Sequence, residues 1–142
     1  MRKAVPAIIF FLLIFVPLAS AGTGELRLEN DRFVIHYTDG DDGLAAELVS
    51  NSLQIRDRVI TDIGVDFTEK TEIRLSPTIE AFREAQPGGR WIPLWATGVA
   101  YPDENIIVLL SPRAIKGSRM NVVEVLAHEF SHIALCRALR GV

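Results

Sequence analysis

Residues 106–139 read IIVLLSPRAIKGSRMNVVEVLAHEFSHIALCRAL, a short apolar run followed by a long helical pattern. The run from Ile106 to Ser111 is continuously apolar until its last residue, which is typical of a strand buried on both faces of a sheet. Asn121 is a favoured helix N-cap residue, and Glu124 three positions later makes an Asn version of the capping box. The stretch therefore predicts a buried strand and then a helix over 122–139.

The sequence before this stretch alternates between strand and helix patterns. An acidic turn at 39–42 ends in helix N-cap residues. The apolar residues after it are spaced as on one face of a helix and predict a helix over 43–62, which Gly64 ends. The strands are predicted from period-two alternation and turn signals, over 25–29, 32–38, 71–75 and 95–101, with a short helix or turn over 78–85. This order predicts an α+β fold in which a mixed sheet packs on two long helices.

The first 21 residues have the three-part pattern of a secretory leader. Arg2 and Lys3 form a basic start, an apolar run follows, and Ala19-Ser20-Ala21 is a small-residue cleavage site. The pattern predicts a signal peptide over 1–21 and a single exported domain over 22–142, periplasmic or extracellular. The alternative is a membrane anchor formed by an uncleaved leader, but the apolar run is shorter than the roughly 20 residues that a spanning helix needs.

Charge and cysteine content exclude some classes of protein. The formal net charge is −3 and becomes more negative without the leader, so no basic stripe is present to neutralise phosphates and a nucleic-acid partner is not expected. Cys136 is the only cysteine, so the domain has no internal disulfide. After cleavage of the leader, no stable membrane span is expected.

The helix over 122–139 carries the pentapeptide His128-Glu129-Phe130-Ser131-His132. Two histidines four residues apart lie on one face of a helix, where both imidazoles can bind one Zn²⁺. Glu129 points about 100° further round the helix, where it can act as a general base on a water molecule without binding the metal. The alternative is an exposed or capping histidine pair on an ordinary core helix. The apolar residues around the motif favour the metal site, because buried polar side chains need partners.

The segment Leu126 to His132 resembles the active-site helix of the zincin metallopeptidases, and the strands before it resemble the edge strand and its neighbour in the zincin upper domain. In the metzincin branch, the second histidine is followed by a glycine and a third histidine, but Leu135 and Ala138 stand at those positions. The resemblance is therefore to the peptidase-MA-like proteins of the gluzincin branch. It implies a zinc-dependent peptidase with Glu129 as the base, His128 and His132 as metal ligands, and a peptide or protein substrate.

In the gluzincin pattern, the third zinc ligand is a glutamate on a second helix, a couple of dozen residues after the second histidine. The sequence ends at Val142, so this ligand is expected from a completing C-terminal segment or from another chain. Three internal residues are alternatives, each with a plainer role: Glu124 as a helix cap, Cys136 as a small buried residue and His36 as an ordinary strand histidine. The resemblance also implies that the backbone over 98–101 pairs with an extended substrate.

Two hypotheses about function remain open. The first is an exported zinc peptidase of which this chain is the N-terminal part. The second is a zincin scaffold, non-catalytic or truncated, that acts in binding and holds zinc weakly or not at all, since catalytic zinc usually has three protein ligands. Trp91, Trp95 and Tyr101 are expected either to line a substrate cleft or to pack in the core or at its rim.

Overall fold

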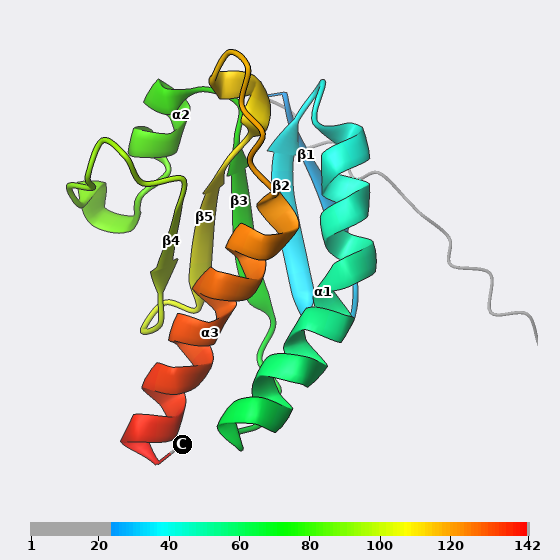
Figure 1. Ribbon diagram of the computed structural model, residues 1–142, viewed down its shortest axis with the longest axis vertical. Coiled ribbons are helices and arrows are strands. Elements are labelled where there is room, and N and C mark those ends of the chain that lie inside the picture. Colours follow the sequence, from blue (N-terminus) through cyan, green and yellow to red (C-terminus); the bar gives the residue numbers. More distant parts are fainter. Residues whose placement is uncertain (1–23, 142) are drawn as a thin grey trace, which may run out of the picture.

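The computed structural model describes residues 24–141, so the predicted leader at 1–21 lies outside the described residues. The elements follow the predicted order, and the α+β class with a mixed sheet is confirmed (Figure 1). The strands and helices are β1 (Glu25–Glu29), β2 (Phe33–Thr38), α1 (Asp42–Ile63), β3 (Thr71–Ser76), α2 (Ile79–Glu84), β4 (Gly98–Tyr101), β5 (Ile106–Leu110) and α3 (Val122–Arg140).

The five strands form one sheet in the order β1-β2-β3-β5-β4. The inner pairs β2–β3 and β3–β5 are parallel, and the outer pairs β1–β2 and β4–β5 are antiparallel. β5 has a neighbour on each side, and all five of its residues are buried, as its apolar sequence predicts. β4 is an edge strand of the sheet.

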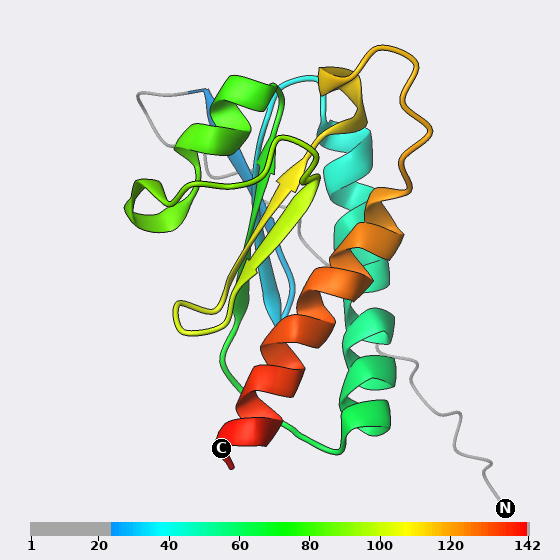
Figure 2. The ribbon, with the colours of Figure 1, turned by 60° about the vertical axis from the view of Figure 1, so that its left-hand side comes forward.

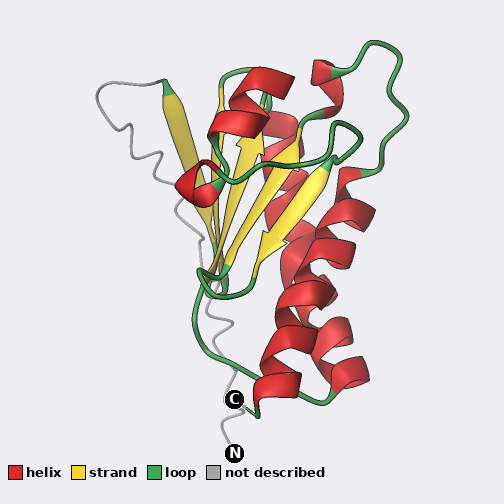
Figure 3. Cartoon of the chain, turned by 90° about the vertical axis from the view of Figure 1, so that its left-hand side faces the viewer, coloured by secondary structure: helices red, strands yellow, loops and turns green. Residues whose placement is uncertain are grey.

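The two long helices cover one face of the sheet, and α2 with the loop that follows it lies on the other face (Figures 2 and 3). The main core lies between the sheet and the long helices. Phe130 of α3 is fully buried there, with its ring centroid 5.4 Å from that of Phe33 and 5.8 Å from that of Phe67. Phe33, Ile35 and Tyr37 all point to this face, which confirms the alternation predicted for the second strand.

A second, smaller core lies under α2 and includes Phe82, Ile92, Tyr101 and Val108. The Tyr101 hydroxyl donates a hydrogen bond to Oε1 of Gln86 at 2.5 Å, inside this cluster. Both faces of the β4–β5 pair are therefore packed, which fixes the position of β4 relative to α3.

Two local predictions need correction. The fourth strand begins at Gly98 and not at Trp95, because the backbone turns at Pro93, where the N–H of Ala96 donates to the Pro93 carbonyl at 3.1 Å. The acidic turn before α1 supplies no side-chain cap. The Asp41 carboxylate instead accepts hydrogen bonds from Ser111 and Arg113, and so ties this turn to the end of β5.

Candidate metal centre

The rotation of α3 about its axis is set by its cap and its apolar face. Asn121 accepts hydrogen bonds from the backbone N–H groups of Val123 and Glu124, at 3.1 and 3.3 Å, which confirms the predicted N-cap. Leu126, Phe130 and the rest of the apolar face are buried against the sheet and α1. Because this face is fixed, the residues between its positions are turned outward or toward β4.

His128 and His132 are on the outward side, and both are exposed. Their rings are nearly perpendicular, at 87°, and the two Nε2 atoms face each other at 3.1 Å. Two nitrogens bound to one tetrahedral zinc at 2.0–2.1 Å would be separated by about 3.3 Å. The imidazole pair therefore fits two positions of a zinc site, and the same separation also fits a hydrogen bond between neutral rings.

The exposure of both rings corrects one step of the sequence argument. The apolar context suggested that the histidines are buried and so need partners, but water reaches both imidazoles. Glu129 lies between the two histidines in sequence but is only 8% exposed. It is therefore the one polar side chain of the motif that is buried and needs a partner.

Glu129 points toward the edge strand and packs against Gly98. A Cβ built on Gly98 would lie 2.9 Å from Cγ and 3.1 Å from Oε1 of Glu129, and 2.6 Å from Cγ1 of Val125. These distances are shorter than van der Waals contacts, so only glycine fits here without movement. This role of Gly98 was not predicted, although a glycine within a strand is a known sign of close approach by a neighbouring group.

Burial raises the pKa of the Glu129 carboxyl above its usual value. His128 and His132 oppose this shift, and so does the backbone N–H of Ala100 on β4. Burial is the largest cause, so the pKa is raised on balance. A buried carboxylate beside two imidazoles has the character expected of a general base near neutral pH.

The backbone of β4 is open on the side away from β5. The N–H of Leu110 donates to the carbonyl of Thr97 at 2.9 Å, and in an antiparallel pair the bonded positions alternate. Val99 and Tyr101 therefore also bond to β5, whereas the N–H and C=O groups of Gly98 and Ala100 point outward. The Ala100 N–H already hydrogen-bonds to Glu129, so the groups of the predicted substrate-pairing edge that remain open are the carbonyls of Gly98 and Ala100 and the N–H of Gly98.

A pocket of about 380 Å³ opens between this edge and the N-terminal half of α3. Its lining includes His128 and Glu129 from the helix, Thr97 and Gly98 from the edge segment, and the exposed indole of Trp95. Tyr101 instead belongs to the second core, so of the three aromatic candidates for a cleft, only Trp95 lies beside the motif.

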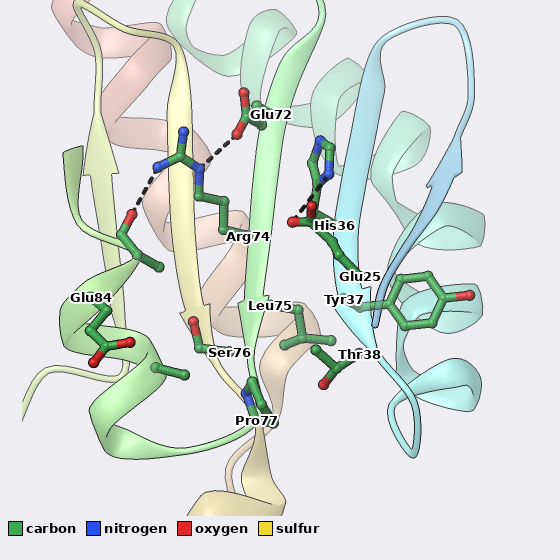
Figure 4. Close-up of a pocket in the computed structure, with 12 residues that line it drawn as sticks. Glu25, His36, Tyr37, Thr38, Glu72, Arg74, Leu75, Ser76, Pro77 and Glu84 are labelled. Atoms are coloured by element: carbon green, nitrogen blue, oxygen red, sulfur yellow. Dashed lines mark hydrogen bonds and ion pairs between the residues drawn. The ribbon is translucent and has the colours of Figure 1, made fainter. Parts of the chain in front are cut away.

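No third ligand joins the two histidines within residues 24–141, where no group of three or more His, Cys, Asp or Glu side chains could hold a metal ion. Glu124 lies at the capped end of α3, and Cys136 is a free, partly buried thiol on the same helix. His36 lies on the opposite face of the sheet, where its Nδ1 is 3.5 Å from Oε1 of Glu25 (Figure 4).

No protein-family model, curated protein or solved structure matches this chain. Across residues 24–141, the helices lack the combination of length and hydropathy that crossing a bilayer requires.

Proposed function

We propose that this chain carries the metal-binding and general-base half of an exported zinc peptidase, of the zincin type and its gluzincin branch. The observation that supports this most strongly is the geometry of α3. The Nε2 atoms of His128 and His132 face each other at 3.1 Å, next to a buried Glu129 that faces an open strand edge. The leader pattern at 1–21 supports the exported location.

A zinc ion held by His128 and His132 would polarise the substrate carbonyl and make a water molecule acidic near neutral pH. Glu129 accepts a proton from the water as its oxygen attacks the carbonyl carbon. When the C–N bond breaks, the same carboxyl gives that proton to the leaving amine nitrogen. The raised pKa of Glu129 suits both transfers, because the group is a stronger base than an exposed carboxylate.

The substrate would bind as an extended strand along β4. Gly98 offers an outward N–H and C=O and Ala100 an outward C=O, whereas the Ala100 N–H bonds to Glu129. A peptide that pairs with these open groups would run past the carboxyl of Glu129. Main-chain pairing of this kind is independent of sequence. Side-chain preference would come from the pocket that Trp95, Thr97 and Val125 line.

In this proposal, the third ligand would come from a segment that packs on the outer side of α3. His128, His132, Leu135 and Leu139 share this side at helical spacing, and both leucines are exposed. An element that covers the leucines would also reach the histidine pair, which is the completing segment expected from the gluzincin resemblance.

A second candidate function is metal binding or protein binding without catalysis. Two observations favour it: only two ligands come together within the described residues, and the imidazoles are close enough to hydrogen-bond to each other without a metal. A site with two protein ligands is a weak one.

The two functions are separated by measuring zinc content and hydrolysis together. The chain together with the completing segment that supplies the third ligand, and the Glu129→Gln and His128→Ala variants of this completed protein, are compared by elemental analysis and with a quenched fluorescent peptide library. The peptidase proposal expects zinc in the wild type and in Glu129→Gln, loss of zinc in His128→Ala, and hydrolysis only in the wild type. Hydrolysis that survives Glu129→Gln would remove the base from its role, and zinc without hydrolysis in any sample would favour the binding function.

A further inference from the structure

Most of the large apolar side chains that are exposed within residues 24–141 lie in one region of the molecule. Of the eight large hydrophobic side chains that are exposed within residues 24–141, five come from α2, the loop before β4 and the loop after β5. Three of them are almost fully exposed in one short loop, namely Trp91, Leu94 and Trp95, at 83, 81 and 82%. The other two are Ile79 and Ile115.

Four of these five side chains border one small cavity of about 100 Å³. Ile79, Leu94, Trp95 and Ile115 all line it, although they come from three separate segments of the chain. They therefore form a continuous surface. These four side chains and Trp91, which precedes Ile92 in the same loop, make up the apolar loop patch. Contiguous apolar patches on a soluble domain mark sites that contact another apolar phase.

The loop is held in this conformation by its own packing. Ile92 is 8% exposed and lies in the second core beside Phe82, which also lines the cavity. The turn from Pro93 to Ala96 is closed by a backbone hydrogen bond at 3.1 Å, and Pro93 restricts the backbone further. One apolar residue thus anchors the loop, while the three around it are presented outward.

The charges beside the patch are basic on balance. Arg83 lines the cavity and Lys116 directly follows Ile115; both are exposed, and neither lies within 4.0 Å of a carboxylate among the described residues. Glu80, which directly follows Ile79, is also exposed and is acidic. Arg90, by contrast, is paired with Glu104 at 2.6 Å. Glu84 is on the other side of α2, where it lines the separate cavity drawn in Figure 4.

We propose that the apolar loop patch inserts into the interface of an anionic lipid membrane. Tryptophan is enriched at the boundary between headgroups and acyl chains, and leucine is among the apolar side chains that membrane-surface proteins bury there. Arg83 and Lys116 beside them match the negative charge of anionic headgroups. This chemistry is independent of the proposed peptidase function. Because Trp95 also lines the pocket of His128 and Glu129, insertion places that pocket at the membrane surface.

The two tryptophans of the chain are both in the patch, so tryptophan fluorescence reports on this surface; Trp95 also reports on the pocket of His128 and Glu129. The full chain is titrated with vesicles of phosphatidylcholine and with vesicles of equal parts phosphatidylcholine and phosphatidylglycerol. We expect a blue shift of the emission with the anionic vesicles, at much lower lipid concentration than with phosphatidylcholine, and the same response with and without a metal chelator.

Variants at exposed positions test the assignment without disturbing the core. Leu94→Ser keeps both tryptophans and should weaken the vesicle response about tenfold, because one leucine no longer enters the apolar phase. Leu139→Ser is the matched control, since Leu139 is equally exposed, at 81%, but lies at the far end of α3 and should give no change. Arg83→Gln and Lys116→Gln should each weaken binding to anionic vesicles about fivefold.

Three outcomes would overturn the proposal. These are an emission spectrum that anionic vesicles do not move, an equal loss from Leu94→Ser and Leu139→Ser, and a blue shift that follows protein concentration in the absence of lipid. The last would assign the patch to contact between protein surfaces.

Discussion

The side chain of Glu129 occupies the space that a side chain on Gly98 would need: a Cβ on Gly98 would lie 2.9 Å from Cγ of Glu129. This contact joins the metal-binding helix to the edge strand. It places the carboxylate beside the backbone of β4, where it accepts a hydrogen bond from the N–H of Ala100. The candidate site is therefore a product of helix–strand packing as much as of the helical motif.

Gly98→Ala should displace Glu129 and leave the histidines in place. The added methyl group overlaps Cγ1 of Val125 at 2.6 Å and the Glu129 side chain, so we expect a loss of about 1–3 kcal/mol of stability from overpacking. Hydrolysis should fall about 100-fold, since a base displaced by about 1 Å has that effect. Bound zinc, measured by elemental analysis, should not change.

Gly43→Ala is the control for this substitution. No atom lies within 4 Å of a Cβ at Gly43, which is in α1, so alanine there should leave hydrolysis unchanged and stabilise the helix by up to about 1 kcal/mol. Equal activity of Gly98→Ala and the wild type would show that the contact with Glu129 has no part in the reaction.

Glu129→Gln should make the metal-free chain more stable at neutral pH. Burial raises the pKa of Glu129 in the folded state above the value of 4.5 that applies when it is unfolded. Between these two pKa values the folded state binds more protons than the unfolded state, so this carboxyl costs stability as the pH rises through that window. Glutamine carries no charge and avoids this cost.

The pH dependence of melting in the presence of a chelator checks this prediction. The melting temperature of Glu129→Gln should exceed that of the wild type at pH 7 and above, and the difference should shrink toward zero as the pH falls below 4.5. A difference that is constant with pH would exclude the ionisation of Glu129 as its cause.

Phe130→Ala should destabilise the fold more than any change on the outer side of α3. Phe130 is fully buried between Phe33 and Phe67, so removal of its ring leaves a cavity and should cost about 3–5 kcal/mol. Leu139→Ala, at an exposed position of the same helix, should change stability by less than about 0.5 kcal/mol. Urea unfolding of both variants measures this contrast. Similar unfolding midpoints for the two variants would show that the Phe130 side chain does not contribute to the stability of the core.

Much of the fold could be predicted from local patterns. The apolar run of β5 indicated a central strand, and Asn121 indicated the first turn of α3, because both signals depend on only a few adjacent residues. The segment from Trp95 to Thr97 looked like part of a strand, but a turn at Pro93 excludes it. Asp41 looked like a helix cap but bonds instead to Ser111, 70 positions away, a contact that no local pattern encodes.

One part of the candidate site could also be predicted from local sequence, and another part could not. The spacing of His128 and His132 fixes their common face, so their approach was predictable from the helix alone. Their exposure was not predictable, because it depends on which face of α3 packs on the sheet. The contact between Glu129 and Gly98 joins residues 31 positions apart, so only the tertiary structure reveals it.

The central claim is that His128 and His132 bind one zinc ion together, and nuclear magnetic resonance of the imidazole nitrogens tests it most directly. The chain has only three histidines, and His36 on the opposite face of the sheet serves as an internal reference. We expect the Nε2 signals of His128 and His132 to shift together and to saturate at one zinc per chain, while those of His36 stay in place. If neither signal moves, if only one does, or if His36 moves equally, the histidine pair is not a zinc site.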